Sequence, residues 1–383
     1  MVDDALTRCV GEPGHFLSTA WERGVSLHSG SQAADLLSLD DVDHLLADSA
    51  LRAPSFRVVK DGSPIPAHRY LRTARVGSRR IDDLIDPGRV HALYADGATV
   101  VLQGLHRYWP PLTRFCRSLE LALEHPVQAN AYLTPPDAAG LDVHCDAHDV
   151  FALQTYGEKR WVAWPRFAPL DDLPAPALDR TLIEGDVLYV PRDTPHLVRT
   201  VDSASLHITI GIRVVTRRDV LQGAVEQALA DPALDAAMPP GWARDPDALT
   251  AQLGADLGHV AERLADADPT PHLAGEADRF WANRQPALGG QLRELLTLDE
   301  IDDATALRRR PGAVAQVQER DDAVDLVLGD RRVRFPPRIA KALRVAVESD
   351  ALTVADLSGE LDADGRRVLA RRLVSEGLLV RSG

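Results

Sequence analysis

The stretch VHCDAHDVFALQTYGEKRW, residues 143–161, places two histidines and two aspartates within six positions. His144 and His148 would meet on one face of a helix because they are four residues apart, as in helical zinc sites. The β-branched and aromatic residues around the pair favour a strand instead. We therefore expect these residues to lie on extended chain.

The spacing along a strand decides which side chains can share an ion. His144, Asp146 and His148 would all face one side of the strand. Two residues span about 6.6 Å, so His144 and His148 would lie roughly 13 Å apart, too far for one ion unless the chain bends. His144 and Asp146 remain within reach of a common metal. We expect His148 at the rim of the site and a third ligand from elsewhere in the chain.

The candidate third ligand is His196, in the stretch EGDVLYVPRDTPHLV at 184–198. Gly185 and Asp186 predict a turn, a strand follows, and two prolines bend the chain before the histidine. An antiparallel barrel can fold this strand back beside the first. Two imidazoles and one carboxylate with open positions form the facial triad of non-haem Fe(II) oxygenases. The alternative is three unrelated polar residues, but a distant histidine after a Gly-Asp strand favours the metal.

A lysine follows the expected ligand strand. Lys159 comes after a Tyr-Gly turn and is predicted on the adjoining strand. If iron activates O2 with 2-oxoglutarate, the far carboxylate of this cosubstrate needs a cation, which a buried ammonium supplies. Asn130 and Thr209 could add neutral hydrogen bonds to the cosubstrate. The alternatives are an exposed strand lysine and purely structural roles for the two polar residues.

Periodicity divides the chain into regions. Residues 14–60 show two helical patterns and a strand, and the second helical pattern opens with a capping box of Ser38 and Asp41. Residues 79–97 fit one more helix, interrupted around Pro87-Gly88. Short β-type runs separated by Pro, Gly and Asp occupy much of residues 99–215, which predicts an antiparallel barrel or sandwich. Residues 217–300 are helical again, with apolar stripes that could dock on the barrel or pair with a second copy.

The C-terminal region has the order of a winged helix: a hairpin with a Gly-Asp turn, three helices and a return strand. Residues 331–383 hold 11 Lys and Arg against 7 Asp and Glu, whereas the whole chain has a net charge of −14. The third helix carries four arginines: Arg366, Arg367, Arg371 and Arg372. These could bind DNA, but a solvated basic face on a small packing domain is favoured because the rest of the chain is acidic.

Composition argues against several classes of protein. No apolar run approaches the ~20 residues that cross a bilayer, so a membrane partner is not expected. Cys9, Cys116 and Cys145 show no CxxC spacing, which argues against a disulfide framework or a cysteine zinc site. The opening residues contain neither a basic nor an apolar signal region. We predict a cytoplasmic protein that does not have nucleic acid as a partner.

Four segments of this sequence resemble the JmjC-type 2-oxoglutarate oxygenases, in particular the ribosomal oxygenase group of protein hydroxylases. They are YADGATVVLQGLHRYWPPL at 94–112, QANAYLTPP at 128–136, HCDAHDVFALQTYGEKRW at 144–161 and EGDVLYVPRDTPH at 184–196. The order of regions is also similar, so the resemblance covers nearly the full chain. Cys145 is a departure, because an aromatic residue is frequent there in such motifs. This departure bears on the lining of the site and on substrate preference.

The resemblance implies an α+β fold in three parts. These are a double-stranded β-helix barrel of the cupin or jelly-roll kind with N-terminal helices at 1–215, a helical dimerisation segment at 216–305 and a winged helix at 306–383. By the same resemblance His144, Asp146 and His196 are the catalytic iron ligands and Lys159 anchors 2-oxoglutarate. The winged helix of this family is not an established DNA-binding domain.

The expected activity is that of an Fe(II)- and 2-oxoglutarate-dependent dioxygenase, which uses O2 to hydroxylate a protein side chain. We expect the protein to be a homodimer. A histidine or arginine of a ribosomal protein is the expected target. One alternative is a hydroxylase of a small peptide or amino acid in a biosynthetic pathway. Another is a regulator in which the barrel senses a ligand and the winged helix binds DNA.

Overall fold

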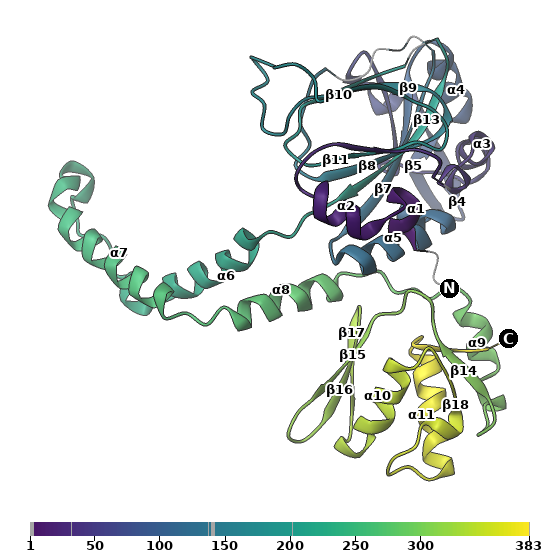
Figure 1. Ribbon diagram of the computed structural model, residues 1–383, viewed down its shortest axis with the longest axis vertical. Helices are drawn as coiled ribbons and strands as arrows, with labels where there is room; N and C mark the ends of the chain where they lie inside the picture. The colour runs from purple at the N-terminus through teal and green to yellow at the C-terminus, as the bar shows by residue number, and fades with distance from the viewer. Residues whose placement is uncertain (1–3, 32, 137, 139–141, 201, 383) are drawn as a thin grey trace. The chain divides into compact units, whose positions relative to one another are not determined.

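The structure is a computed structural model that describes residues 4–31, 33–136, 138, 142–200 and 202–382. The chain forms two compact units, Met1–Val214 and Val215–Gly383 (Figure 1). Helices and strands are mixed in both units, as the sequence predicts. None of the helices in the described residues is long and apolar enough to span a membrane.

The first unit is built on an eight-stranded antiparallel sheet in the order β1-β11-β8-β13-β7-β6-β2-β3. Its strands are β1 Ser26–His28, β2 Phe56–Lys60, β3 Ser63–Pro64, β6 Thr99–Leu102, β7 Val127–Thr134, β8 Asp149–Gly157, β11 Val187–Val190 and β13 Ser205–Ile212. A second sheet has the order β10-β9-β12, with β9 Lys159–Ala163, β10 Leu178–Leu182 and β12 His196–Arg199. A separate hairpin consists of β4 Leu71–Val76 and β5 Arg79–Ile85.

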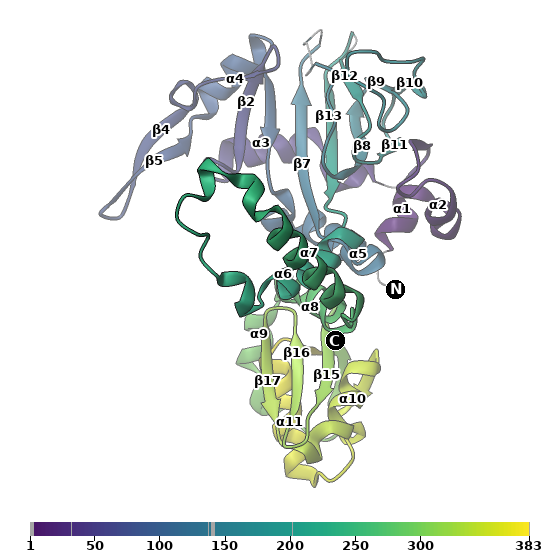
Figure 2. The same ribbon diagram turned by 90° about the vertical axis from the view of Figure 1, so that its left-hand side faces the viewer.

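Helices cover one face of the large sheet. They are α1 Ala5–Val10, α2 Pro13–Thr19, α3 Leu39–Asp48, α4 Pro87–Ala95 and α5 Pro110–Leu123, with 3₁₀ turns η1 Ala34–Leu36, η2 Ala67–Arg69 and η3 Leu105–Arg107. Alternate residues of β7, β8 and β13, such as Ala131, Phe151 and Ile208, belong to the same buried core as Leu6, Leu45 and other residues of these helices. Figure 2 shows β7 and β13 running side by side through this unit. Period-two burial therefore gives these strands one helix-facing side.

The opposite side of the large sheet, called the inner face below, looks toward the second sheet. Val150 and Ala152 of β8 form a buried cluster with Trp161 of β9 and Leu182 of β10. The two sheets thus pack face to face, and the prediction of an antiparallel barrel or sandwich is confirmed. Register places the other residues of the inner face: Thr209 pairs with Ala152 on one side and with Asn130 on the other.

The prediction of a helix at residues 79–97 is wrong for its first half. Residues 79–85 form β5, which pairs with β4, and Leu84 and Ile85 are buried. The helix α4 begins only at Pro87, where Asp86 caps it by accepting from the N–H of Arg89. Proline fixes the backbone of a first helical turn but disrupts a helix interior, which sets the boundary at this position.

The second unit begins with helices. They are α6 Arg217–Leu229, α7 Thr250–Ala265, α8 Thr270–Ala282 and α9 Gln291–Leu296, with 3₁₀ turns η4 Pro232–Asp235, η5 Trp242–Arg244, η6 Pro246–Leu249 and η7 Leu298–Glu300. The buried apolar residues of α6–α8 are few, namely Ala224, Ala228 and Phe280 among the described residues. Large apolar side chains remain exposed on the same helices: Leu221, Val225, Leu229, Leu253, Leu257 and Leu273.

The rest of the second unit has two small sheets, β18-β14-β19 and β15-β16-β17. Its elements are β14 Ala306–Arg309, β15 Ala315–Glu319, β16 Val324–Leu328, β17 Arg331–Phe335, η8 Pro337–Ile339, α10 Ala340–Glu348, β18 Ala351–Thr353, η9 Val354–Asp356, α11 Ala363–Ser375 and β19 Leu379–Arg381. Residues of both sheets share one core with Leu343 of α10 and Leu373 of α11. The hairpin at Gly329-Asp330, the last helix and the return strand occur where the sequence predicts them.

Candidate metal centre

Two histidines from distant parts of the chain are joined through their backbones. His144 precedes β8 and His196 is the first residue of β12. They form an isolated antiparallel bridge, in which the N–H of His144 donates to His196 O at 3.2 Å and the N–H of His196 donates to His144 O at 2.9 Å. Paired residues of antiparallel strands have neighbouring side chains. The two rings accordingly lie 4.4 Å apart, centroid to centroid.

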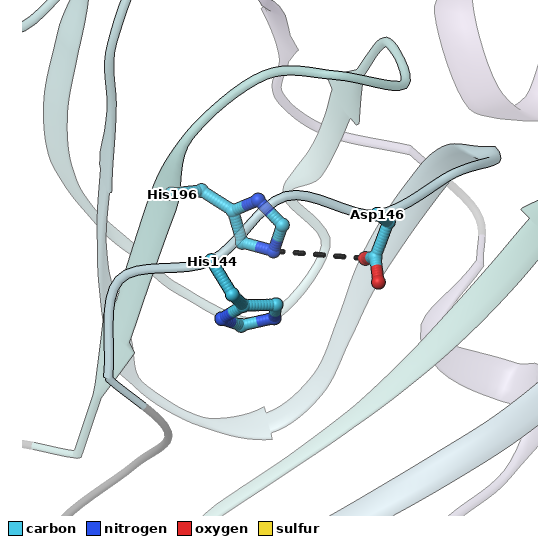
Figure 3. Close-up of side chains that lie close together, drawn as sticks. All are labelled: His144, Asp146 and His196. Atoms are coloured by element: carbon cyan, nitrogen blue, oxygen red, sulfur yellow. Dashed lines mark ion pairs between the residues drawn. The ribbon is translucent and has the colours of Figure 1, made fainter. Parts of the chain in front are cut away.

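His144, Asp146 and His196 come together into a compact set of possible metal ligands (Figure 3). Each offers one donor atom, and the three atoms lie within 4.8 Å of one another. His196 Nε2 is 3.7 Å from Asp146 Oδ2. His196 is buried, whereas the other two side chains are partly exposed. A shared ion could therefore be reached from solvent on one side.

The outer nitrogens of both imidazoles are already engaged. Nδ1 of His144 lies 2.8 Å from the carbonyl of Asp142, and Nδ1 of His196 lies 3.0 Å from the carbonyl of Thr194. A carbonyl can only accept, so each Nδ1 carries the proton and each Nε2 keeps a free lone pair. Burial, together with the neighbouring His144, lowers the pKa of His196, which favours the neutral form that binds a metal. The donor set fits a divalent metal with borderline ligand preference.

His148 lies outside the set of three donors formed by the described residues. Its ring packs against Gly211 of β13, where a Cβ would approach His148 Cδ2 to 2.5 Å. Residues 143–148 are not a strand, contrary to the expectation from the sequence; β8 begins at Asp149. The chain bends at Val143 and again at residues 147–148. These bends separate His148 from His144 and Asp146, whereas the sequence predicted a separation by the rise of a straight strand.

Lys159 is the first residue of β9 and is only 5% exposed. Its Nζ donates to Thr134 Oγ1 at 3.0 Å. Among the residues that the structure describes, no carboxylate forms an ion pair with it. Burial lowers the pKa of Lys159 to about 7. A buried ammonium without a counter-charge is costly, so this position is suited to an anion.

Asn130 and Thr209 occur as cross-strand partners on the inner face. Asn130 Oδ1 accepts a hydrogen bond from the N–H of Gly104 at 3.0 Å, and Gly104 has a positive φ of 68°. This contact holds the left-handed turn after β6, so the oxygen of Asn130 has a structural role. Its amide NH2 and the hydroxyl of Thr209 are the groups that remain for a ligand.

Several polar and aromatic residues of the inner face are not predicted from the sequence. The ring of Tyr132 stacks on His207 at 5.0 Å, and the ring of Trp161 lies 5.9 Å from His196 and 5.7 Å from His207. Trp161 Nε1, His207 Nδ1 and Gln154 Oε1 are buried without a hydrogen-bond partner in the described residues. Burial and the charge of Lys159 hold the pKa of His207 well below its usual value.

The alternation of β7 contains the signal for these residues. Asn130, Tyr132 and Thr134 are two residues apart, so once one of them is assigned to the inner face, the other two follow. The same holds for Thr209 and His207 on β13. In the described residues, the polar atoms without a partner and the ammonium without a carboxylate make this face suited to a polar, anionic ligand.

Comparison with known proteins places this chain near proteins of the JmjC type. A model of the JmjC domain matches residues 106–220. Ribosomal oxygenase 2 of Bos taurus is 29% identical over 341 residues, covering 74% of this chain and 72% of that protein. The bifunctional lysine-specific demethylase and histidyl-hydroxylase NO66 of Drosophila mojavensis is 27% identical over 214 residues, covering 51% of this chain and 23% of that protein.

Among solved structures, the chain is similar to YcfD, a ribosomal oxygenase of Escherichia coli in complex with cobalt and 2-oxoglutarate. The TM-score is 0.55 and the identity 17%, over 97% of this chain and 98% of YcfD. This likeness shows a shared cupin-like fold. The chain matches less than a third of the length of the Drosophila relatives, for example 23% and 27%. The resemblance drawn from the sequence is confirmed: the chain contains a match to the JmjC domain and has homologues among the ribosomal oxygenases.

Proposed function

We propose that this chain is an Fe(II)- and 2-oxoglutarate-dependent hydroxylase of a protein side chain. The observation that carries the proposal is the convergence of the donor atoms of His144, Asp146 and His196. The ammonium of Lys159, which has no carboxylate partner among the described residues, lies on an adjoining strand. A metal site alone would suit hydrolysis or sensing. A buried cation nearby is needed only if the bound molecule is itself an anion.

Two imidazoles and one carboxylate are the ligand set of non-haem Fe(II) oxygenases. In our proposal the three residues hold iron through His144 Nε2, His196 Nε2 and an oxygen of Asp146. The iron, with 2-oxoglutarate and O2, supplies the oxidising power for hydroxylation. The contributions of the protein are to fix the ligands, orient the cosubstrate and keep water out of the buried side of the site.

Lys159 is proposed to bind the carboxylate of 2-oxoglutarate that is distant from the metal. Thr134, already bonded to Lys159, holds the ammonium in place. The NH2 of Asn130 and the hydroxyl of Thr209 are proposed as neutral donors on the same face. Nδ1 of His207 and Nε1 of Trp161, which have no hydrogen-bond partner in the part of the chain that the structure describes, are further hydrogen-bonding groups near this position.

The substrate is proposed to be a ribosomal protein, hydroxylated on a histidine or arginine. Relatives named ribosomal oxygenases and a histidyl-hydroxylase support this choice. One relative is also named a lysine-specific demethylase, so demethylation is the competing outcome for the same site. A hydroxylase of small peptides remains a weaker alternative, because no observation on this structure favours it.

The proposal includes a homodimer, formed through residues 216–305, and a winged helix at 306–383. The exposed apolar side chains of α6–α8 support the dimer. DNA binding through α11 is not favoured, because its arginines are engaged within the chain. Arg366 pairs with Asp303, Arg367 with Asp364 and Arg372 with Glu376, and Arg371 donates to the carbonyl of Asp299. A cytoplasmic location remains a prediction.

The test compares ribosomal proteins from cells with and without the gene by mass spectrometry. We expect one protein to lose a mass of about 16 Da, one oxygen atom, when the gene is absent. Restoring the gene should restore the mass, and restoring it with His196→Ala should not. A difference of about 14 Da per methyl group would instead indicate demethylation, and no difference in any ribosomal protein would contradict the proposed substrate.

A further inference from the structure

The turn at residues 191–195, between β11 and β12, is hydrogen-bonded to two of the three candidate metal ligands. The N–H of Asp193 donates to the carbonyl of Asp146 at 2.9 Å. The carbonyl of Thr194 accepts from His196 Nδ1 at 3.0 Å. A shift of this turn would therefore move the backbone of Asp146 and rotate the ring of His196 together.

The conformation of the turn is one that the chain does not adopt freely. Asp193 has a φ of 59°, in the left-handed region that is uncommon for residues other than glycine. Prolines on both sides, Pro191 and Pro195, further restrict the backbone. A backbone conformation of this kind persists only where contacts with surrounding residues stabilise it.

Arg192 is held at three points, each by a different part of the chain. Its N–H donates to Asp149 Oδ1 at 2.9 Å, and its carbonyl accepts from Arg166 Nε at 2.9 Å. Its guanidinium donates to the carboxylate of Glu22: Nη2 lies 2.7 Å from Oε2, and Nε lies 3.0 Å from Oε1. These three contacts fix the direction in which the chain enters the turn.

Glu22 connects the contacts into one network. Its carboxylate also receives Arg166 at 3.2 Å, and its backbone N–H donates to the hydroxyl of Tyr189 at 3.0 Å. That hydroxyl donates in turn to Asp149. Burial alone would raise the pKa of Glu22, but the hydrogen bonds and charges of Arg192 and Arg166 lower it to about 2. Burial raises the pKa of Asp149, whose side chain is fully enclosed.

We propose that Glu22 and Asp149 are positioning residues that hold Arg192, and through it the 191–195 turn, so that Asp146 and His196 are set for metal binding before the metal arrives. The inference rests on the proposed metal site. Neither carboxylate belongs to the set of three donors. They act as outer contacts that orient ligands, and the loss of such contacts typically lowers metal affinity by about 10–100-fold.

Binding of Co(II) by the full chain tests the inference without cosubstrate or substrate. Glu22→Gln keeps the size of the side chain and removes its charge, whereas Arg192→Gln removes the charge and shortens the side chain. We expect each to weaken Co(II) binding by about tenfold or more. Arg192→Lys keeps a charge near Glu22 and should recover part of the affinity. The matched control is Asp179→Asn, which breaks an exposed pair with Arg160 in the same unit and should leave Co(II) affinity unchanged.

Two further measurements separate positioning from general stability. The melting temperature of the metal-free protein shows whether a variant is folded at the temperature of the titration. Both changes break the same contact, between Glu22 and Arg192. The double variant Glu22→Gln/Arg192→Gln should therefore have about the same Co(II) affinity as the single variant that binds Co(II) more weakly. Additive losses would contradict a shared role.

The outcomes distinguish this inference from the proposed function. If the natural protein and His196→Ala both fail to bind Co(II), the metal site is wrong, and the inference is wrong with it. If the natural protein binds Co(II), His196→Ala does not, and a folded Glu22→Gln binds as tightly as the natural protein, only the positioning role is overturned.

Discussion

His144 and His196 are antiparallel bridge partners although 52 positions separate them in the sequence, and each donates its backbone N–H to the carbonyl of the other. The bridge turns a local His-x-Asp pair into a three-donor set. His148 lies outside this set because the chain bends between Asp146 and the start of β8. The backbone pairing thus brings the donor atoms of residues 144, 146 and 196 together.

The first prediction concerns the metal ligands. His144→Ala, Asp146→Ala and His196→Ala should each abolish tight Fe(II) or Co(II) binding, because two donors do not hold a divalent ion as three do. His148→Ala is the control and should keep the metal. Calorimetric titration with the metal, alongside a circular dichroism spectrum of each variant, measures this. Loss of metal in His148→Ala with retention in His196→Ala would refute the assignment.

Sequence reasoning reached the three candidate ligands because residue type and order carry that information. It could not give their geometry: the strand assumed at residues 143–148 is an irregular segment. The meeting of His144 and His196 depends on a pairing between distant segments, which no local pattern encodes. The roles of Glu22 and Arg166 were missed for the same reason, since charged residues in turns usually read as solvated surface.

Local signals were most reliable where a single chemical feature sets an element boundary. The capping box at Ser38 and Asp41 starts α3, as expected. Residues 79–85 were misread because Leu84 and Ile85 fit a helical stripe as well as a strand, and only pairing with β4 decides between them. Asn130 is predicted to contact a ligand; its oxygen accepts from the N–H of Gly104, so only its NH2 remains for that role. A polar residue on the right face can still have a structural partner.

The second prediction concerns assembly. Leu257 on α7 is 70% exposed, and several apolar side chains on α6–α8 are exposed with it. If these helices pair with a second copy, Leu257→Glu should shift the protein from dimer to monomer at micromolar concentration, measured by light scattering. Val76→Glu is the control, because Val76 is 68% exposed on β4 of the other unit. A natural protein that is already monomeric would contradict the dimer.

The third prediction follows from the burial of Lys159. Burial lowers its pKa from 10.5 to about 7. Burial of Lys159 therefore lowers the free energy of unfolding at every pH at which the amine is charged in the unfolded chain. The penalty is full below pH 7, falls between pH 7 and 10.5, and is absent above 10.5. Its size is on the order of 5 kcal/mol at most.

Lys159→Met should therefore raise the melting temperature of the ligand-free protein, and the increase should be larger at pH 6.5 than at pH 9.5. Differential scanning calorimetry of both proteins at the two pH values measures this. Other titrating groups are common to both proteins and largely cancel in the difference. An increase that does not depend on pH would mean that Lys159 is not a buried charge.

The fourth prediction separates a 2-oxoglutarate enzyme from other metal-binding cupins. The Lys159 ammonium is buried, bonded to Thr134, and without an anionic partner in the described residues. Removing a buried cation that pairs with a carboxylate costs on the order of 2–5 kcal/mol, or tens- to thousands-fold in affinity. Lys159→Ala should weaken binding of 2-oxoglutarate to the Co(II)-loaded protein by this amount, with Co(II) affinity little changed.

Matched variants make this result specific to charge and position. Lys159→Arg keeps the charge but changes its reach and geometry, so it should recover only part of the affinity. Lys60→Ala removes a lysine of the same unit that pairs with Asp96 and should leave 2-oxoglutarate binding unchanged. Calorimetric titration of each Co(II)-loaded protein with 2-oxoglutarate gives the dissociation constants. If Lys159→Ala binds 2-oxoglutarate as tightly as the natural protein, the carboxylate is held elsewhere, and Lys159 loses its proposed role while the metal site stands.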